Sequence, residues 1–103
     1  MASAFAEAIW GLVRQVPPGQ ATTYGELAEA YFGVRRGSRS VGQAMAGCPK
    51  DVPWWRVVYS DGSAKPDPGG AEQRARLAEE GVPLTADGRV DWEHLGGPWL
   101  FER

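Results

Sequence analysis

The chain contains one cysteine and one histidine, the residue types that most often supply a nucleophile and a base, and they lie far apart. A cysteine attacks as a thiolate, which a neighbouring base usually generates. Cys48 has no histidine near it in the sequence, and we expect His94 to lie at the surface or to cap a helix. A single cysteine also excludes an internal disulfide framework and a cysteine-rich zinc site. Cys48 and His94 therefore do not form a recognisable catalytic pair, and the sequence implies no metal site and no cofactor.

The aromatic and basic residues say more about a possible binding site than Cys48 and His94 do. The chain has five tryptophans in 103 residues, and Trp54 and Trp55 are adjacent. Neighbours on an extended segment point to opposite sides, so one of them is expected to line a site and the other to be buried. Residues 35–65 carry a net charge of +4 and the remainder −6, which gives −2 for the whole chain. This positive segment is either a candidate anion-binding face or a chance fluctuation of surface charge.

The length suits one compact domain, which we place at residues 1–103. No run approaches the ~20 apolar residues of a membrane helix. The amino terminus also lacks the basic-then-apolar pattern of a signal peptide. We expect a soluble, monomeric, cytoplasmic protein, associated with the nucleoid if it is bacterial, with no membrane partner.

Apolar periodicity and capping residues predict three helices before residue 50. The first begins after Ser3 as N-cap and ends before residue 17. The second begins at Thr23 as N-cap, with Glu26 at the capping-box position. The third begins at Ser38 as N-cap and runs to about residue 47, with one face of small side chains. A short turn before a small-faced helix that opens with an arginine indicates a helix-turn-helix.

Shorter elements are expected in the second half. Residues 56–59 predict a strand that leads into a hairpin-type turn at residues 60–62. Residues 71–81 predict a polar helix that docks mainly through Leu77 and has Gly81 as its C-cap. Residues 82–85 and 89–92 predict a small hairpin. The fold class is therefore mainly α, a small winged-helix-like helix-turn-helix domain of the DNA-binding kind with short β-hairpins.

Five ordered segments together resemble the carboxy-terminal DNA-binding domain of O6-alkylguanine-DNA alkyltransferases, over roughly residues 5–82. They are residues 16–19, 23–28, 38–45, 52–58 and 77–81. Where that family carries Pro-Cys-His-Arg-Val, this chain has Pro53-Trp54-Trp55-Arg56-Val57. The alkyl-accepting cysteine thus falls on Trp54 and the activating histidine on Trp55. An indole offers an N–H donor and no basic lone pair.

The chain is therefore similar to the alkyltransferase-like subfamily. Its members bind alkylated guanine in DNA without repairing it and mark it for nucleotide excision repair. This resemblance implies a non-enzymatic DNA-damage sensor. Its partners would be duplex DNA that contains O6-alkylguanine and nucleotide excision repair proteins.

The resemblance also assigns roles to individual residues. Arg39 would fill the gap of a flipped nucleotide, and Tyr24 would press on the neighbouring phosphate. Arg56 would support the site through Glu80, and main-chain groups of Val57 would read the base edge. The expected DNA-binding residues are Tyr24, Arg35, Arg36, Arg39, Ser40, Gly42, Gln43, Ala46 and Lys50. The expected lesion-pocket residues are Met45, Trp54, Trp55, Arg56, Val57 and Tyr59.

Several alternatives stay open at this point. The indole of Trp54 either lines the pocket or fills it. Gly42 allows close approach either of DNA or of another element of the protein. The chain could also be an active alkyltransferase that uses Cys48, or a helix-turn-helix regulator that reads undamaged DNA.

Overall fold

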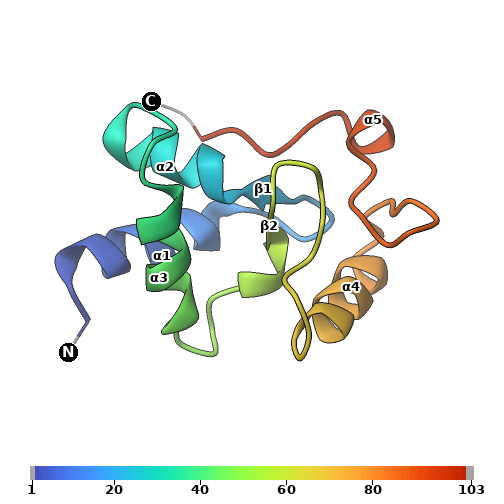
Figure 1. The fold of residues 1–103 in the computed structure, drawn as a ribbon, viewed down its shortest axis with the longest axis horizontal. Helices are drawn as coiled ribbons and strands as arrows, with labels where there is room; N and C mark the ends of the chain where they lie inside the picture. The colour runs from blue at the N-terminus through green and yellow to red at the C-terminus, as the bar shows by residue number, and fades with distance from the viewer. Residues whose placement is uncertain (1, 102–103) are drawn as a thin grey trace.

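The computed structural model describes residues 2–101 and is mainly helical, which confirms the predicted fold class. Helices α1, α2 and α3 occupy one end of the molecule, α4 and α5 occupy the other, and two short strands lie between them (Figure 1). The elements in chain order are α1 (Ala4–Gln15), β1 (Thr22–Thr23), α2 (Tyr24–Phe32), α3 (Ser38–Ala46), the 3-10 turn η1 (Trp54–Arg56), β2 (Val57–Val58), α4 (Gly70–Glu79) and α5 (Trp92–Leu95).

The first three helices form one hydrophobic core. Capping residues fix where two of them begin, as predicted: the backbone N–H of Ala6 donates to Ser3 Oγ, and that of Glu26 donates to Thr23 Oγ1, each at 3.0 Å. The helices bury Ile9, Val13, Leu27, Ala28 and Val41 against one another, together with Val52. Burial of these side chains holds α3 against α1 and α2.

The prediction for the start of α3 was wrong by one position. Gly37 is the N-cap, with φ +97°, and Ser38 is the first helical residue. The Ser38 hydroxyl instead donates to the carbonyl oxygen of Arg35 at 3.1 Å. A Cβ on Gly37 would lie 2.5 Å from the Phe32 ring, so both the left-handed backbone and the close packing favour glycine here.

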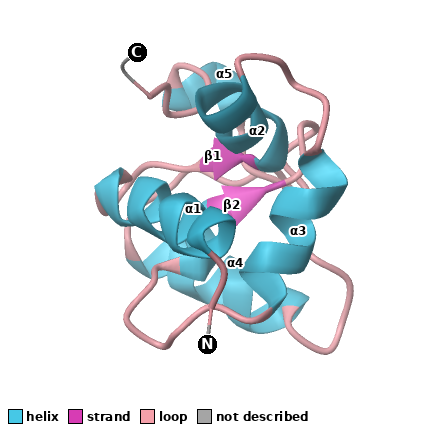
Figure 2. Ribbon diagram, turned by 90° about the vertical axis from the view of Figure 1, so that its left-hand side faces the viewer, coloured by secondary structure: helices cyan, strands magenta, loops and turns pink. Residues whose placement is uncertain are grey.

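The strand predicted over residues 56–59 forms at Val57–Val58 only, and the predicted turn after it is present. Val57 and Val58 pair in parallel with Thr22 and Thr23, a strand that the sequence did not predict (Figure 2). Residues 59–63 make a tight turn, closed by a hydrogen bond from Tyr59 N–H to the Ser63 carbonyl at 3.0 Å. In the described part of the chain no antiparallel strand follows this turn, because β1 is the partner of β2.

Helix α4 closes the other end of the molecule over a second hydrophobic cluster, which Leu77 shares with Val58, Val82 and Val90. The C-cap is Glu80, one residue before the predicted Gly81, which follows with φ +84°. The predicted small hairpin is present as a single antiparallel bridge between Leu84 and Val90.

Helix α5 was not predicted as a helix. Its N-cap Asp91 accepts the backbone N–H of His94 at 3.2 Å, and the His94 ring lies 2.7 Å from the same carboxylate. Within residues 2–101, none of the helices is long and apolar enough to cross a membrane.

Candidate nucleic-acid interface

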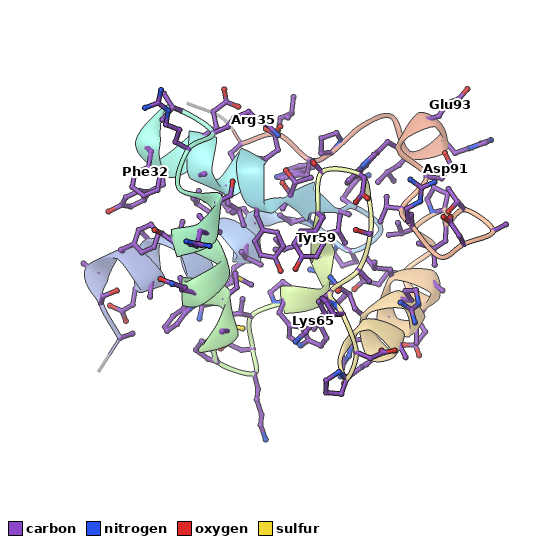
Figure 3. The ribbon with its side chains drawn as sticks, in the orientation of Figure 1. Phe32, Arg35, Tyr59, Lys65, Asp91 and Glu93 are labelled. Carbon is purple, nitrogen blue, oxygen red and sulfur yellow. The ribbon has the colours of Figure 1, made fainter. Side chains whose placement is uncertain are left out.

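A cavity of about 860 Å³ lies between α3 on one side and the segment from η1 to the loop before α4 on the other. In Figure 3, Tyr59 and Lys65 are labelled on the side opposite α3. The lining includes eight residues predicted for the DNA-binding face or the pocket: Tyr24, Arg39, Gly42, Gln43, Met45, Ala46, Trp54 and Tyr59. Ser38, Cys48, Lys65 and Pro66 complete it. The structure thus brings the two predicted sets of residues to one place.

Helix α3 has its exposed face at the rim of this cavity. Val41 and Met45 point into the core and are buried, whereas Arg39, Gln43 and Ala46 are exposed. A Cβ on Gly42 would have no atom of the described chain within 4 Å. The missing side chain of Gly42 therefore serves no packing contact inside the described protein. It leaves a surface that the backbone of another molecule can approach closely.

Tyr24 occupies the cavity wall at the first turn of α2. Burial, with smaller contributions from Tyr59 and Cys48, raises the pKa of Tyr24 to about 12. The ring centroids of Tyr24 and Tyr59 are 5.3 Å apart. The phenol therefore stays protonated at neutral pH and can donate a hydrogen bond to an anion such as a phosphate.

Trp54 lines the cavity and does not fill it. Its ring is half-buried and meets the ring of Trp55 edge to face, with centroids 6.1 Å apart. The Lys65 ammonium lies 5.6 Å from the Trp54 ring centroid. The cavity therefore offers an apolar indole wall beside a cation.

Trp55, Arg56 and Val57 do not line the cavity, in contrast to the prediction. Residues 54–56 form a 3-10 turn and not an extended strand, so the two adjacent tryptophans are not on opposite faces of a sheet. The guanidinium carbons of Arg56 and Arg76 lie over the Trp55 ring, 5.3 and 4.7 Å from its centroid. Trp55, Arg56 and Val57 therefore belong to the segment that carries Trp54 but lie outside the cavity lining.

The main chain of Val57 is already engaged in hydrogen bonds. Its N–H donates to the carbonyl oxygen of Trp54, and its own carbonyl accepts from Gln73 Nε2 at 2.7 Å. The expected reading of a base edge by Val57 is therefore not supported.

Arg56 acts as the predicted support through Glu80. Its Nε and Nη2 donate to the two carboxylate oxygens at 3.0 and 2.5 Å, and its Nη1 donates to the carbonyl of Val16 at 2.9 Å. The side chains of Arg56 and Glu80 are only 11% and 16% exposed. This bidentate pair ties η1 to the end of α4 and to the turn after α1.

The Arg56–Glu80 pair predicts acid sensitivity. Burial alone would raise the pKa of Glu80, but the hydrogen bonds from Arg56, the nearby Trp55 indole and the Arg56 charge outweigh it and lower the pKa below the ordinary 4.5. Trp55 Nε1 itself is buried without a hydrogen bond of good geometry. Stability from the pair is present above pH 4.5 and is lost as the pH falls through the lowered pKa of the folded state.

We therefore expect the melting temperature to fall on acidification below pH 4.5, and to fall less steeply in Glu80→Gln. Thermal melts of both proteins between pH 6 and pH 3 measure this. Equal slopes for the two proteins would contradict the assignment to Glu80.

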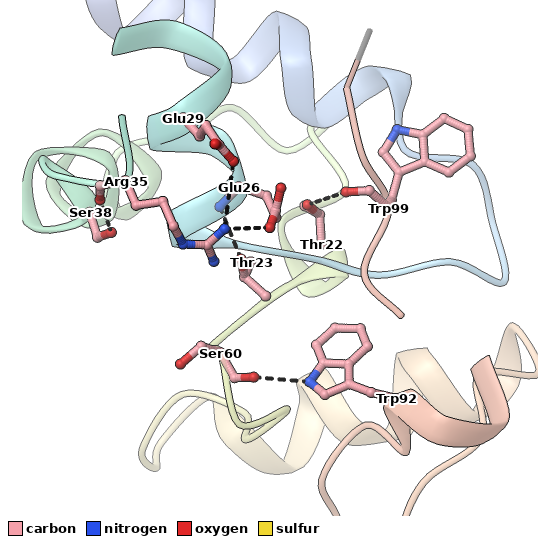
Figure 4. A network of polar contacts seen from close by, with 9 residues as sticks. All are labelled: Thr22, Thr23, Glu26, Glu29, Arg35, Ser38, Ser60, Trp92 and Trp99. Atoms are coloured by element: carbon pink, nitrogen blue, oxygen red, sulfur yellow. Dashed lines mark hydrogen bonds and ion pairs between the residues drawn. The ribbon is translucent and has the colours of Figure 1, made fainter. Parts of the chain in front are cut away.

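The predicted phosphate-binding cations differ in their surroundings. The Arg35 guanidinium binds Glu26 at 2.6 Å and Glu29 at 3.6 Å, so it is already paired with acidic groups (Figure 4). Arg36, Lys50 and Ser40 are exposed but lie outside the cavity lining. Of the predicted cations, Arg39 is the one that reaches the cavity.

Cys48 lines the cavity but lacks the environment of a reactive thiol. Burial, assisted by Asp51, raises the pKa of Cys48, which disfavours the thiolate. His94 is paired with Asp91 at α5, at the other end of the molecule. Among residues 2–101, no group of three or more His, Cys, Asp or Glu side chains is arranged to hold a metal ion.

Comparison with known proteins identifies the family. The family model for the DNA-binding domain of 6-O-methylguanine DNA methyltransferase matches residues 4–82. The chain belongs to this family. A DNA base-flipping protein of Escherichia coli K12 is 34% identical over 90 residues, which are 84% of this chain and 69% of the relative. Alkyltransferase-like protein 1 of Schizosaccharomyces pombe is 42% identical over 81 residues, 74% of each chain.

Two solved structures of family members are also similar. One is S. pombe Atl1 in complex with damaged DNA that contains O6-carboxymethylguanine. It has a TM-score of 0.72 and 33% identity, and the match covers 96% of this chain and 95% of the other. The other is the O6-methylguanine methyltransferase of Mycobacterium tuberculosis, with a TM-score of 0.69 and 30% identity over 84% of this chain and 54% of that one. The predicted resemblance is thereby confirmed.

Proposed function

We propose that this member of the family is a non-enzymatic sensor of O6-alkylguanine in duplex DNA. The observation that carries the proposal is the cavity beside α3, in which an indole lines the wall where the resemblance expects a nucleophilic thiol. The names of its relatives, a DNA base-flipping protein and an alkyltransferase-like protein, support the same function. In this proposal the protein binds the damaged base and does not remove its alkyl group.

The proposed mechanism uses the small face of α3 to enter the minor groove. Gly42, Gln43 and Ala46 allow the helix to approach the base edges closely. Flipping a nucleotide costs a few kcal/mol, so one group must crowd the backbone and another must refill the stack. Tyr24 is proposed to press on the phosphate and Arg39 to occupy the gap, because a guanidinium stacks and donates hydrogen bonds.

The extruded base then enters the cavity between α3 and Trp54. The indole supplies an apolar wall for the alkyl group, and Lys65 supplies a hydrogen-bond donor beside the ring. Arg36 and Lys50 add phosphate contacts, which depend on salt and carry no sequence information. We further propose that the protein acts as a cytoplasmic monomer whose complex with DNA is read by nucleotide excision repair proteins.

Competition binding tests the proposal. The protein is first bound to a fluorescently labelled duplex that contains one O6-methylguanine. Unlabelled duplex of the same sequence, either alkylated or plain, is then added, and anisotropy reports how much labelled duplex it displaces. We expect the alkylated competitor to be at least about tenfold more effective, a difference of about 1.4 kcal/mol. Equal competition by both duplexes would instead support a regulator that reads undamaged DNA.

Replacement of Trp54 by cysteine is expected to leave the protein unable to take the methyl group from O6-methylguanine. In Trp54→Cys the new thiol lacks a base, because the neighbouring indole of Trp55 cannot accept its proton. Transfer of radiolabelled methyl from O6-methylguanine DNA to the variant protein is the measurement. Trp54→Ser, which has no thiol, is the matched control. Stoichiometric labelling of Trp54→Cys within minutes would contradict the argument.

A further inference from the structure

The turn over residues 59–63 carries Tyr59, which lines the cavity together with Tyr24. Tyr59 is 43% exposed, and its ring centroid lies 5.3 Å from that of Tyr24, with the ring planes tilted by 41°. A tyrosine on an exposed turn would ordinarily sample several positions, because loops are more mobile than the elements they connect. The position of the Tyr59 ring against Tyr24 therefore depends on what holds the backbone of this turn.

Hydrogen bonds within the turn fix its shape. Besides the bond from Tyr59 to the Ser63 carbonyl, the Gly62 N–H donates to the Tyr59 carbonyl at 2.8 Å. The Asp61 carboxylate accepts the N–H and the hydroxyl of Ser63, at 3.0 and 2.6 Å. These contacts join residues of the turn to one another. They do not determine how the turn lies relative to Tyr24 on α2.

Two other carbonyls of the turn are bound by residues that follow α4. Trp92 Nε1 donates to the Ser60 carbonyl at 3.0 Å (Figure 4), and the Val90 N–H donates to the Gly62 carbonyl at 2.8 Å. A Cβ on Gly62 would lie 2.5 Å from the Val90 carbonyl oxygen, so this close approach and a φ of +86° both favour glycine. Val90 is buried in the second hydrophobic cluster, and Trp92 packs against that cluster. The turn is thereby attached to the core.

The residues that bind the turn lie outside the part of the chain that matches the family's DNA-binding domain. That match ends at residue 82, whereas Val90 and Trp92 belong to the segment that leads through α5 to the tail. In Figure 1 this segment runs from α5 back across the molecule toward α2. Tyr59 in the cavity wall is thus held by a part of the chain that the match does not include.

We propose that Trp92 is a positioning residue for the site: its indole N–H holds the turn at Ser60, so that the Tyr59 ring stays packed on Tyr24 and keeps the Tyr24 hydroxyl in place for a DNA phosphate. The inference rests on the proposed function, in which Tyr24 presses on the phosphate beside the extruded base. A side chain that is already held in its binding position loses little freedom when DNA binds, which increases the affinity. Trp92 touches no DNA in this scheme and acts through Tyr59.

The free protein provides the first test. With 5.3 Å between the ring centroids, nuclear Overhauser cross-peaks are expected between the ring protons of Tyr24 and Tyr59. Trp92→Phe keeps an aromatic ring against the second cluster but removes the indole donor. We expect these cross-peaks to weaken in the variant, and amide hydrogen exchange at Gly62 to speed up about fivefold, as for the loss of one neutral hydrogen bond. Unchanged cross-peaks in Trp92→Phe would overturn the proposal without touching the proposed function.

Trp99→Phe is the matched control, because it makes the same change on the same segment. The hydrogen bonds of Trp99 with the described residues come from its backbone. Its N–H donates to the Ala21 carbonyl at 2.7 Å, and its carbonyl accepts from the Thr22 hydroxyl at 2.9 Å. We expect Trp99→Phe to keep the tyrosine cross-peaks, the exchange rate of Gly62 and the affinity for DNA. Equal changes in both tryptophan variants would overturn the specific role of Trp92.

The second test is the Kd for O6-methylguanine duplex, measured by fluorescence anisotropy at fixed salt. We expect Trp92→Phe to raise Kd about fivefold. Tyr59→Leu, which removes the ring that packs on Tyr24, should raise it at least as much. In the Tyr59→Leu background, Trp92→Phe should have no further effect, because the ring that Trp92 positions is absent. The full loss of affinity in both backgrounds would show a role that does not act through Tyr59, and would overturn the proposal.

The two tests separate the inference from the proposed function. A wild type that binds alkylated and plain duplex equally well would refute the proposed function, whereas the cross-peaks would still report whether Trp92 positions Tyr59. An unchanged Kd in Trp92→Phe, with a wild type that prefers the alkylated duplex, would overturn the positioning role alone. A thermal melt of Trp92→Phe checks that the variant is folded at the temperature of the binding experiment.

Discussion

Arg39→Ala is expected to lose most of the affinity for O6-methylguanine duplex. Arg39 is exposed at the first turn of α3 and reaches the cavity, whereas Arg35 is bound to Glu26 and Glu29. In the proposed mechanism the Arg39 guanidinium refills the stack, so its removal would leave the unstacking cost of a few kcal/mol without an offset. We expect Kd to rise roughly 30- to 100-fold, or about 2–3 kcal/mol. Fluorescence anisotropy at fixed salt measures it.

A matched control separates this role from simple charge. Arg89→Ala removes the same charge at a turn where the arginine pairs with Asp87, away from the cavity lining. We expect it to change Kd less than about threefold, since one distant charge adds little at physiological ionic strength. Equal losses in both variants would show that Arg39 contributes only net charge.

Arg56→Met is expected to destabilise the fold more than any other single change discussed. The substitution leaves the Glu80 carboxylate and the Val16 carbonyl without the three hydrogen bonds that Arg56 donates. Removing one partner of a largely buried ion pair typically costs about 3–5 kcal/mol. The midpoint of urea unfolding, followed by tryptophan fluorescence, should fall accordingly, and the free energy of unfolding follows from it.

Arg76→Met is the matched control for this prediction. Arg76 pairs with Glu72 one turn away on α4, and both side chains are about half exposed. Exposed pairs of this kind contribute about 0.3–0.5 kcal/mol, and the contact of the Arg76 guanidinium with the Trp55 ring adds about 0.5–1 kcal/mol. A loss of stability in Arg56→Met no larger than in Arg76→Met would contradict the structural role of the Arg56–Glu80 pair.

Local signals in the sequence predicted the helices well. Ser3 and Thr23 cap α1 and α2 as expected, because an N-cap depends on a hydroxyl and a backbone N–H only three residues apart. The small face of α3 was equally visible, because it is a property of one helix. These elements position most of the predicted DNA-binding face.

Long-range contacts account for what the sequence did not predict. Strand β1 is two residues long, and it exists only because Val57 and Val58 pair with it. Gln73 belongs to the helix that was predicted to be polar and to dock mainly through Leu77, yet it is buried and forms hydrogen bonds with three backbone groups outside that helix. No periodicity or spacing encodes such contacts.

The most direct test of the central claim follows the methyl group itself. Excess protein is incubated with a duplex that carries one O6-[³H-methyl]guanine, and the DNA and protein are then separated under denaturing conditions. We predict that the duplex is bound and that all of the label is recovered in the DNA as O6-methylguanine. Label on the protein, at Cys48 or elsewhere, or restored guanine in the DNA, would contradict a sensor that binds without converting.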